Sequence, residues 1–178
     1  DRGYMNDIAS QIAALRCDGR EVCLVGAGAI GLGASELAIK GRVQDVVLRQ
    51  ACAAIGQPIL MQMYRDVFSA YRITIAQVLI TREVLDDRNS YVKLRNAVER
   101  LLEMGILPVF NENDSVATAE IGTAFGDNDQ LSALVASKVD AGLLVLLSDV
   151  DGYYDADPRR APAARLLPTI HAITDEML

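Results

Sequence analysis

Helical and extended hydrophobic patterns alternate along the whole chain, and this alternation restricts the fold more than any other feature of the sequence. Apolar residues recur at helical spacing before the extended runs, as they do from Ile8 to Leu15. The extended runs are 22–25, 73–80, 106–110 and 143–147. Strands that alternate with helices form βαβ units. We therefore predict an α/β fold with a mostly parallel central sheet, in which the last run is a buried strand.

Glycine, proline and aspartate mark the expected ends of helices. Gly56 is expected to separate two helices, and Pro58 to open the second of them in the first turn, where proline is tolerated. Asp86 or Asp87 is expected to cap a long amphipathic helix. Pro108 cannot donate a backbone hydrogen bond, which predicts an edge strand or a strand start at its position.

Composition and charge narrow the class of protein. The chain has 178 residues, 51% of them hydrophobic, which suits one soluble domain with a packed core. Its net charge of −7 disfavours a broad nucleic-acid interface, since such interfaces gather Lys and Arg. We find neither an apolar run of roughly 20 residues nor a signal-peptide pattern. We therefore expect a cytoplasmic protein without a membrane partner, and its apolar content favours a homo-oligomer.

Cysteine and histidine are too few for a metal cluster or a disulfide framework. Cys17, Cys23 and Cys52 are odd in number and form no C-x-x-C pair, so we expect them to be reduced. His171 is the single histidine, and a catalytic triad that uses histidine would depend on it. We read it instead as a loop residue or a first-turn residue of a helix. No protein metal ligands are predicted.

A glycine-rich stretch follows the first predicted strand. Residues 26–31 match G-x-G-x-x-G, the fingerprint of dinucleotide-binding folds. Those folds also place an acidic residue at the end of a second strand about 20 residues later. Asp45 stands near that distance but lies in a segment that reads as helix, which disfavours a dinucleotide site. The glycines still let the backbone approach a ligand and hold an anion, and a tight turn without a ligand is the alternative.

Three polar clusters lie after predicted strands or before a predicted helix. They are Asn111-Glu112-Asn113-Asp114, Gly126-Asp127-Asn128-Asp129 and the segment 148–154. Because ligands collect outside the carboxyl ends of the strands in open α/β sheets, we expect the clusters at one edge of the sheet. Carboxylates accept an ammonium group and Asn donates to carboxylates, which suits a zwitterionic substrate, and the third cluster suits a nucleotide. Asx turns and helix caps are the alternative for single residues.

Together these segments resemble the γ-glutamyl kinase branch of the amino-acid kinase family. The resemblance is carried by Phe110-Asn-Glu-Asn-Asp114, Gly126-Asp-Asn-Asp129, and Ser148-Asp149 with Gly152 and Asp157-Pro158-Arg159. It implies a three-layer α/β/α sandwich and one amino-acid kinase domain over 1–178. It also implies phosphorylation of the side-chain carboxylate of L-glutamate by ATP with Mg²⁺, the first step of proline biosynthesis.

The resemblance implies roles for single residues. The expected catalytic residues are Asp129, which would organise the family's lysines, and Gly28, which would approach the transferring phosphoryl group. The expected substrate-binding residues are Ala27, Asn111, Asp114, Asp127 and Asn128. The expected nucleotide-binding residues are Ser148, Asp149, Gly152 and Asp157. Asp114 would bind the substrate ammonium group, and proline is expected as a feedback inhibitor near the same pocket.

The chain departs from the family pattern at the family's lysines and at Ala27, and the loop from Ile121 to Phe125 is also about two residues longer than expected. The family takes one lysine from an N-terminal strand and another from a Gly-Gly-Met-x-Thr-Lys segment, and neither motif occurs in 1–178. We therefore expect a chain that is cut at both ends or inactive. Ala27 stands where the family normally has a hydroxyl residue, which removes a donor to the substrate. A kinase for another carboxylate substrate and an inactive ligand-binding or scaffold domain are the alternatives.

Overall fold

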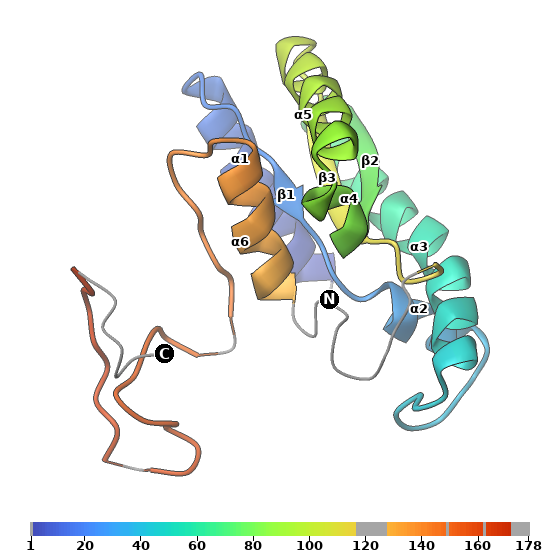
Figure 1. The fold of residues 1–178 in the computed structure, drawn as a ribbon, viewed down its shortest axis with the longest axis vertical. Helices are drawn as coiled ribbons and strands as arrows, with labels where there is room; N and C mark the ends of the chain where they lie inside the picture. The colour runs from blue at the N-terminus through green and yellow to red at the C-terminus, as the bar shows by residue number, and fades with distance from the viewer. Residues whose placement is uncertain (1, 117–127, 149, 162, 172–178) are drawn as a thin grey trace. The chain divides into compact units, whose positions relative to one another are not determined.

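The computed structural model describes residues 2–116, 128–148, 150–161 and 163–171, and it divides into two compact units, Asp1–Leu144 and Val145–Leu178. In the described part of the chain, all helices and all strands with more than a single bridge belong to the first unit (Figure 1). The helices are α1 (Arg2–Cys17), α2 (Ala29–Glu36), α3 (Val46–Ser69), α4 (Arg82–Asp86), α5 (Arg88–Glu103) and α6 (Asn128–Lys138). The strands are β1 (Leu24–Val25), β2 (Ile75–Ile80) and β3 (Leu107–Glu112).

The three strands form a parallel sheet in the order β1-β3-β2. In the register of this sheet, Val25 pairs with Phe110 and Val78 pairs with the same residue from the other side. All strands therefore end at one edge, and the prediction of a parallel α/β sheet is confirmed.

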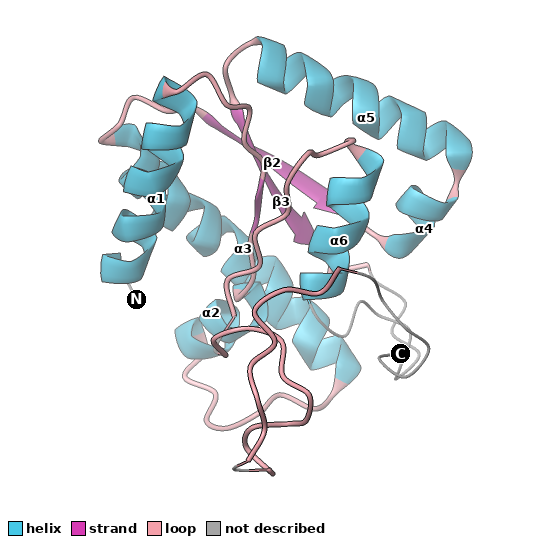
Figure 2. Cartoon of the chain, turned by 90° about the vertical axis from the view of Figure 1, so that its left-hand side faces the viewer, coloured by secondary structure: helices cyan, strands magenta, loops and turns pink. Residues whose placement is uncertain are grey.

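Helices cover both faces of this sheet, as Figure 2 shows for α1 and α5. On one face, α1 and α3 pack on the strands through a core that includes Ala9, Ile12, Phe68, Leu107 and Val109. On the other face, α4, α5 and α6 pack through a core that includes Leu85, Val98, Phe110, Leu131 and Val135. Successive residues of β3 thus point to opposite layers, as the pleat of a strand requires. The three-layer α/β/α arrangement is confirmed.

Helix α3 runs without interruption through Gly56 and Pro58, so the prediction of two separate helices is wrong. Gly56 is buried against α2 and has a packing role there instead of ending a helix. Asp45 caps α3, because its Oδ1 accepts a hydrogen bond of 2.7 Å from the backbone N–H of Leu48. Asp45 therefore stands at the start of a helix and not at the end of a second strand, where a dinucleotide-binding fold would need an acidic residue.

Pro108 lies in the central strand of the sheet and not in an edge strand, but it is the second residue of that strand, which agrees with the prediction of a strand start. The N–H of Leu107 donates to Thr74 O on the β2 side over 2.9 Å. Alternate residues of a strand bond to opposite neighbours, so the nitrogen of Pro108 faces the β1 side. Pairing with β1 begins only at Val109, and the missing donor therefore interrupts no pair of the ladder.

The apolar run from Leu143 to Leu147 forms no strand among the residues that the structure describes, and the prediction of a buried strand is wrong. Leu143 is 79% exposed and Val145 is 66% exposed. An apolar run becomes a strand only where a neighbouring strand receives its backbone hydrogen bonds. The hydrophobicity of the run does not show whether such a neighbouring strand is present.

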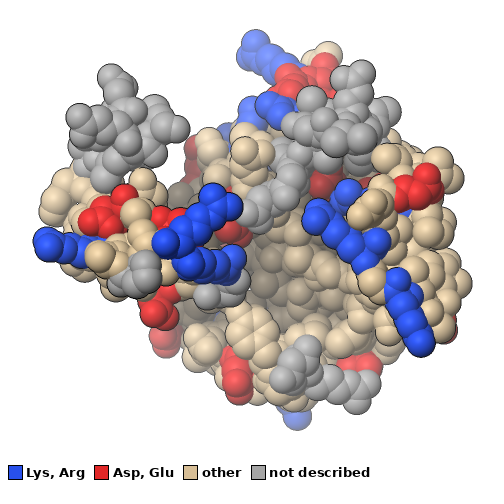
Figure 3. All heavy atoms as spheres, turned by 90° about the horizontal axis from the view of Figure 1, so that it is seen from below, with Lys and Arg blue, Asp and Glu red and all other residues tan. Residues whose placement is uncertain are grey.

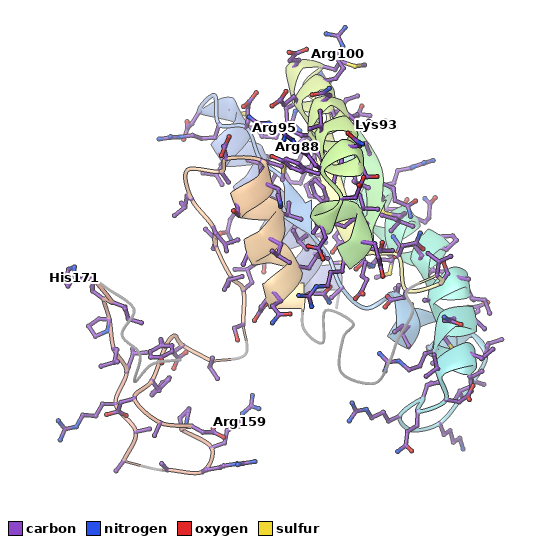
Figure 4. All side chains as sticks on the ribbon, in the orientation of Figure 1. Arg88, Lys93, Arg95, Arg100, Arg159 and His171 are labelled. Atoms are coloured by element: carbon purple, nitrogen blue, oxygen red, sulfur yellow. The ribbon has the colours of Figure 1, made fainter. Side chains whose placement is uncertain are left out.

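Helix α5 confirms the prediction of a long amphipathic helix with an aspartate cap. Asp87 is its N-cap, and the carboxylate accepts a hydrogen bond of 2.7 Å from the N–H of Ser90. Figure 4 shows four basic side chains along this helix, those of Arg88, Lys93, Arg95 and Arg100. Arg95 contacts Glu99 at 2.7 Å and Asp140 at 3.1 Å.

Basic and acidic side chains are interspersed on the molecular face in Figure 3. In the second unit, Tyr154 and Leu166 form an isolated antiparallel bridge. His171 is exposed in that unit, as expected of a loop residue. Of the helices in the described ranges, none is long and apolar enough to cross a membrane.

Candidate functional site

The glycine turn after β1 adopts a conformation that depends on particular glycines. Gly28 precedes α2 with a φ of +103°, a left-handed value that glycine adopts without strain. A Cβ at Gly26 would lie 2.9 Å from the hydroxyl oxygen of Tyr64. Gly31, by contrast, has no neighbouring atom within 4 Å of a Cβ position. Of the three motif glycines, Gly28 is therefore required by its backbone conformation, and Gly26 lies in close contact with the Tyr64 side chain.

Backbone hydrogen bonds tie the glycine turn to β3 and the polar segment after β3 to β2. The N–H of Gly26 donates to Phe110 O over 2.8 Å, and the N–H of Asn113 donates to Ile80 O over 2.8 Å. Ser115 Oγ donates to Asn113 Oδ1 over 2.7 Å. These bonds hold the ends of the three strands together at the carboxyl edge of the sheet, where a ligand is expected.

A cavity of about 330 Å³ opens at this edge. Its lining includes Ala29, Gln57, Gln77, Glu112, Asn113 and Asp114. Two of these side chains are carboxylates, and among the described residues no lysine or arginine belongs to the lining. The cavity therefore suits a group with a positive charge and N–H donors more than a phosphate.

Asn111 lies behind the cavity and is 4% exposed. Its Nδ2 donates a hydrogen bond of 2.8 Å to Gln57 Oε1, and its Oδ1 accepts one of 2.9 Å from the N–H of Glu112. Gln57 is also buried, and its Nε2 has no hydrogen-bond partner in the described structure. An unpaired buried donor costs about 1–3 kcal/mol of stability.

Asp114 is a partly buried carboxylate in the cavity lining. Burial raises the pKa of its carboxyl above the usual value, and the positive charge of Arg49 opposes this shift. A buried carboxylate is poorly hydrated, so it gains more from a cationic ligand than an exposed one does. Asp114 is therefore suited to an ammonium group.

The structure brings together only part of the predicted site. Asp114 lines the cavity directly, and the exposed pair Ala27-Gly28 adjoins Ala29, which also lines it. Asn128 and Asp129 form the first turn of α6 and are not among the lining residues. Asp127 and Asp149 lie outside the described residues.

The remaining predicted nucleotide-side residues lie in the second unit. Ser148 and Gly152 are exposed there. The carboxylate of Asp157 accepts a hydrogen bond of 2.9 Å from the N–H of Arg159 and lies 3.5 Å from Arg160 Nε. Asp157 thus shapes its own loop, and its role toward a nucleotide stays a prediction.

Sequence reasoning missed Gln57 and Gln77, which line the cavity from α3 and β2, and Arg49, whose charge reaches Asp114. Gln57 stands in a helix and had no predicted role in the site, and its hydrogen bond with Asn111 in the folded protein reveals its position there. Within the described ranges, no group of three or more His, Cys, Asp or Glu side chains could hold a metal ion.

Comparison with known proteins identifies the family. The model of the amino acid kinase family matches residues 1–177. A glutamate 5-kinase from Methanosarcina barkeri is 48% identical over 99% of this chain, and one from Thermus thermophilus is 48% identical over 97% of it. The chain spans 46% of the length of each of these relatives.

Solved structures share the fold. The isopentenyl phosphate kinase of T. acidophilum, in a product complex, superimposes with a TM-score of 0.58 at 23% identity, over 93% of this chain and 69% of that chain. Another isopentenyl phosphate kinase structure gives a TM-score of 0.60 at 21% identity, over 97% of this chain and 72% of that chain. With a family match that runs through both compact units, the chain belongs to the amino acid kinase family.

Proposed function

We propose that this chain provides the amino-acid-binding region of a glutamate 5-kinase. The reaction transfers the γ-phosphoryl group of ATP to the side-chain carboxylate of L-glutamate and forms glutamyl 5-phosphate, the first step of proline biosynthesis. The observation that carries the proposal is the cavity at the carboxyl end of β3, which Glu112 and Asp114 line. The 48% identity to glutamate 5-kinases favours glutamate as its ligand.

Asp114 is the group that selects a free amino acid. Its carboxylate accepts hydrogen bonds from the substrate ammonium group, and partial burial strengthens this charged contact. Ala27, Asn111, Asp127 and Asn128 belong to the same glutamate pocket in this proposal. Proline, which carries an ammonium group and a carboxylate as well, would act as an inhibitor at or near it.

Phosphoryl transfer to glutamate requires no general base, because the accepting carboxylate is already ionised at neutral pH. Catalysis therefore consists of alignment and neutralisation of phosphate charge. Gly28 would let the backbone approach the transferring phosphoryl group, and Asp129 would orient lysine side chains. Ser148, Asp149, Gly152 and Asp157 would form the nucleotide side. Mg²⁺ would be held chiefly by the phosphates of ATP, as this ion usually is.

The family match through residues 1–177 supports a single amino-acid kinase domain that includes both compact units. We also propose that the protein acts in the cytoplasm as a homo-oligomer.

Isothermal titration with L-glutamate tests the proposal. Asp114→Ala is expected to abolish binding, because the ammonium group loses its acceptor. Asp86→Ala is the matched control, since Asp86 is an exposed carboxylate on α4 whose side chain lies 3.8 Å from Arg82. N-acetyl-L-glutamate, which has no ammonium group, is expected to give no heat. The proposal would be contradicted if the folded wild-type chain did not bind L-glutamate, or if it bound N-acetyl-L-glutamate equally well.

A further inference from the structure

We propose that the side-chain amide of Gln57 binds a carboxylate of the amino-acid substrate, and that Asn111 positions this amide. The inference rests on the proposed function and deepens it, because it adds a binding residue to the same cavity. Gln57 lies on α3, 54 positions before Asn111 in the chain. The two side chains meet only in the folded protein.

The hydrogen bonds of Asn111 determine which way the Gln57 amide faces. The N–H of Glu112 can only donate, so the atom of Asn111 that it contacts at 2.9 Å is the oxygen. The nitrogen of Asn111 therefore faces Gln57 and contacts it at 2.8 Å. A nitrogen donor requires an acceptor, so Gln57 presents Oε1 to Asn111 and turns Nε2 away from it.

The Nε2 group that results has two N–H donors and no partner among the described residues. Gln57 is only 8% exposed, so bulk water does not replace the missing acceptor. Buried amide groups are almost always paired in folded proteins. Gln57 also belongs to the cavity lining, so its buried amide lies next to the proposed glutamate site.

The acidic lining of the cavity means that a substrate carboxylate requires a neutral hydrogen-bond donor there. Glu112 and Asp114 both line it, and their negative charges repel a carboxylate. A zwitterion therefore binds well only if its ammonium group meets Asp114 and its carboxylate meets a neutral donor. Gln57 supplies that donor without a competing hydrogen bond, whereas Gln77, the other glutamine in the lining, is exposed.

Titration of the 178-residue chain with L-glutamate tests the role of Gln57. Gln57→Glu keeps the acceptor for Asn111 and nearly the same shape, but it replaces the donor by a group that repels a carboxylate. We expect at least about tenfold weaker binding from Gln57→Glu and about tenfold weaker binding from Gln57→Met. Gln62→Glu is the matched control, because Gln62 is an exposed glutamine on the same helix and lies outside the cavity lining; it is expected to change the affinity by less than about threefold.

Asn111→Asp tests the positioning role without altering Gln57. An aspartate at position 111 still accepts from the N–H of Glu112, but it offers Gln57 an oxygen. The Gln57 amide then turns Nε2 toward Asp and Oε1 away from it, so the substrate carboxylate faces an acceptor. We expect about tenfold weaker binding.

Two ligands that each lack one carboxylate distinguish binding from a structural role. L-glutamine replaces the side-chain carboxylate by an amide, and L-isoglutamine replaces the α-carboxylate. The effect of Gln57→Glu should shrink to less than about threefold for the ligand that lacks the carboxylate bound by Gln57. An equal loss for all three ligands in folded variants would show that Gln57 only maintains the shape of the cavity, and would overturn the inference.

The inference and the proposed function fail in different ways. If the wild-type chain binds L-glutamate and Gln57→Glu binds it equally well, the inference is overturned and the proposed function stands. If the folded wild-type chain binds none of the three amino acids, both are overturned. Circular dichroism and thermal unfolding of every variant establish that the comparison is between folded proteins.

Discussion

Gly56 approaches Ala29 so closely that a Cβ atom on Gly56 would lie 1.8 Å from the carbonyl oxygen of Ala29. Gly33 makes the reciprocal contact, since a Cβ there would lie 1.9 Å from the carbonyl oxygen of Cys52. Helices α2 and α3 therefore touch backbone to backbone. This contact holds the Gly28 turn beside the helix that carries Gln57.

Gly56→Ala is expected to lower the free energy of unfolding by at least about 2 kcal/mol, because the methyl group overlaps fixed backbone atoms of α2. A flexible side chain could move aside, but a carbonyl oxygen within a helix cannot move without shifting that helix. Urea unfolding followed by circular dichroism measures the change.

Gly31→Ala is the control for this prediction. Gly31 also lies in α2, but a Cβ there would have no neighbour within 4 Å. Alanine favours a helix over glycine by about 1 kcal/mol, so this variant should be as stable as the wild type or slightly more stable. Equal destabilisation by both substitutions would rule out the close helix contact as the cause.

Asp114→Asn is expected to stabilise the ligand-free protein near neutral pH. Burial raises the pKa of Asp114 in the folded state, so the folded protein binds this proton more readily than the unfolded chain does. The ionised carboxylate therefore costs stability, and the cost disappears as the pH falls through the raised pKa. The advantage of Asp114→Asn should shrink on acidification toward about pH 4.

Thermal unfolding of wild type and Asp114→Asn between about pH 7 and pH 4 measures this difference. A gap in melting temperature that grows on acidification would mean that the pKa of Asp114 is lowered by folding. In that case the charge of Arg49 would outweigh burial.

The three cysteines are expected to react at different rates with a thiol reagent. Cys17 is exposed, whereas Cys52 is fully buried. Burial, with a smaller contribution from the charge of Glu21, raises the pKa of Cys23 to about 11. At about pH 8 only on the order of 0.1% of Cys23 is thiolate, the reactive form.

We therefore expect one fast thiol in the native protein and three after denaturation in urea. Ellman's reagent measures the rates, and Cys17→Ser should remove the fast phase. A second fast thiol in the native chain would contradict the burial of Cys23.

Asp45→Ala is expected to destabilise the protein by about 1 kcal/mol, because the N–H of Leu48 loses its acceptor at the start of α3. Asp45→Asn keeps an acceptor and should be nearly neutral. Chemical denaturation compares the two. If both substitutions cost the same, the negative charge and not the cap hydrogen bond stabilises the helix.

Local patterns in the sequence were sufficient for the layers of the fold and for one part of the site. The alternation of helical and extended hydrophobic patterns predicted a parallel sheet covered by helices, and Asp87 marked the start of α5. Asp114 follows the last residues of β3, and strand ends in a parallel sheet lie at the same edge. These features depend on neighbours in the sequence, so the sequence shows them directly.

Other features depend on residues far apart in the chain. Gly56 looked like the end of a helix, but its neighbour across the interface is Ala29, which allows the helix to continue. Leu143 to Leu147 looked like a buried strand, yet no partner strand pairs with it among the described residues. No site role was predicted for Gln57, whose amide is oriented by a hydrogen bond from Asn111. Tertiary contacts decided these cases because glycine, an apolar run and a buried amide each acquire their role from the atoms packed against them.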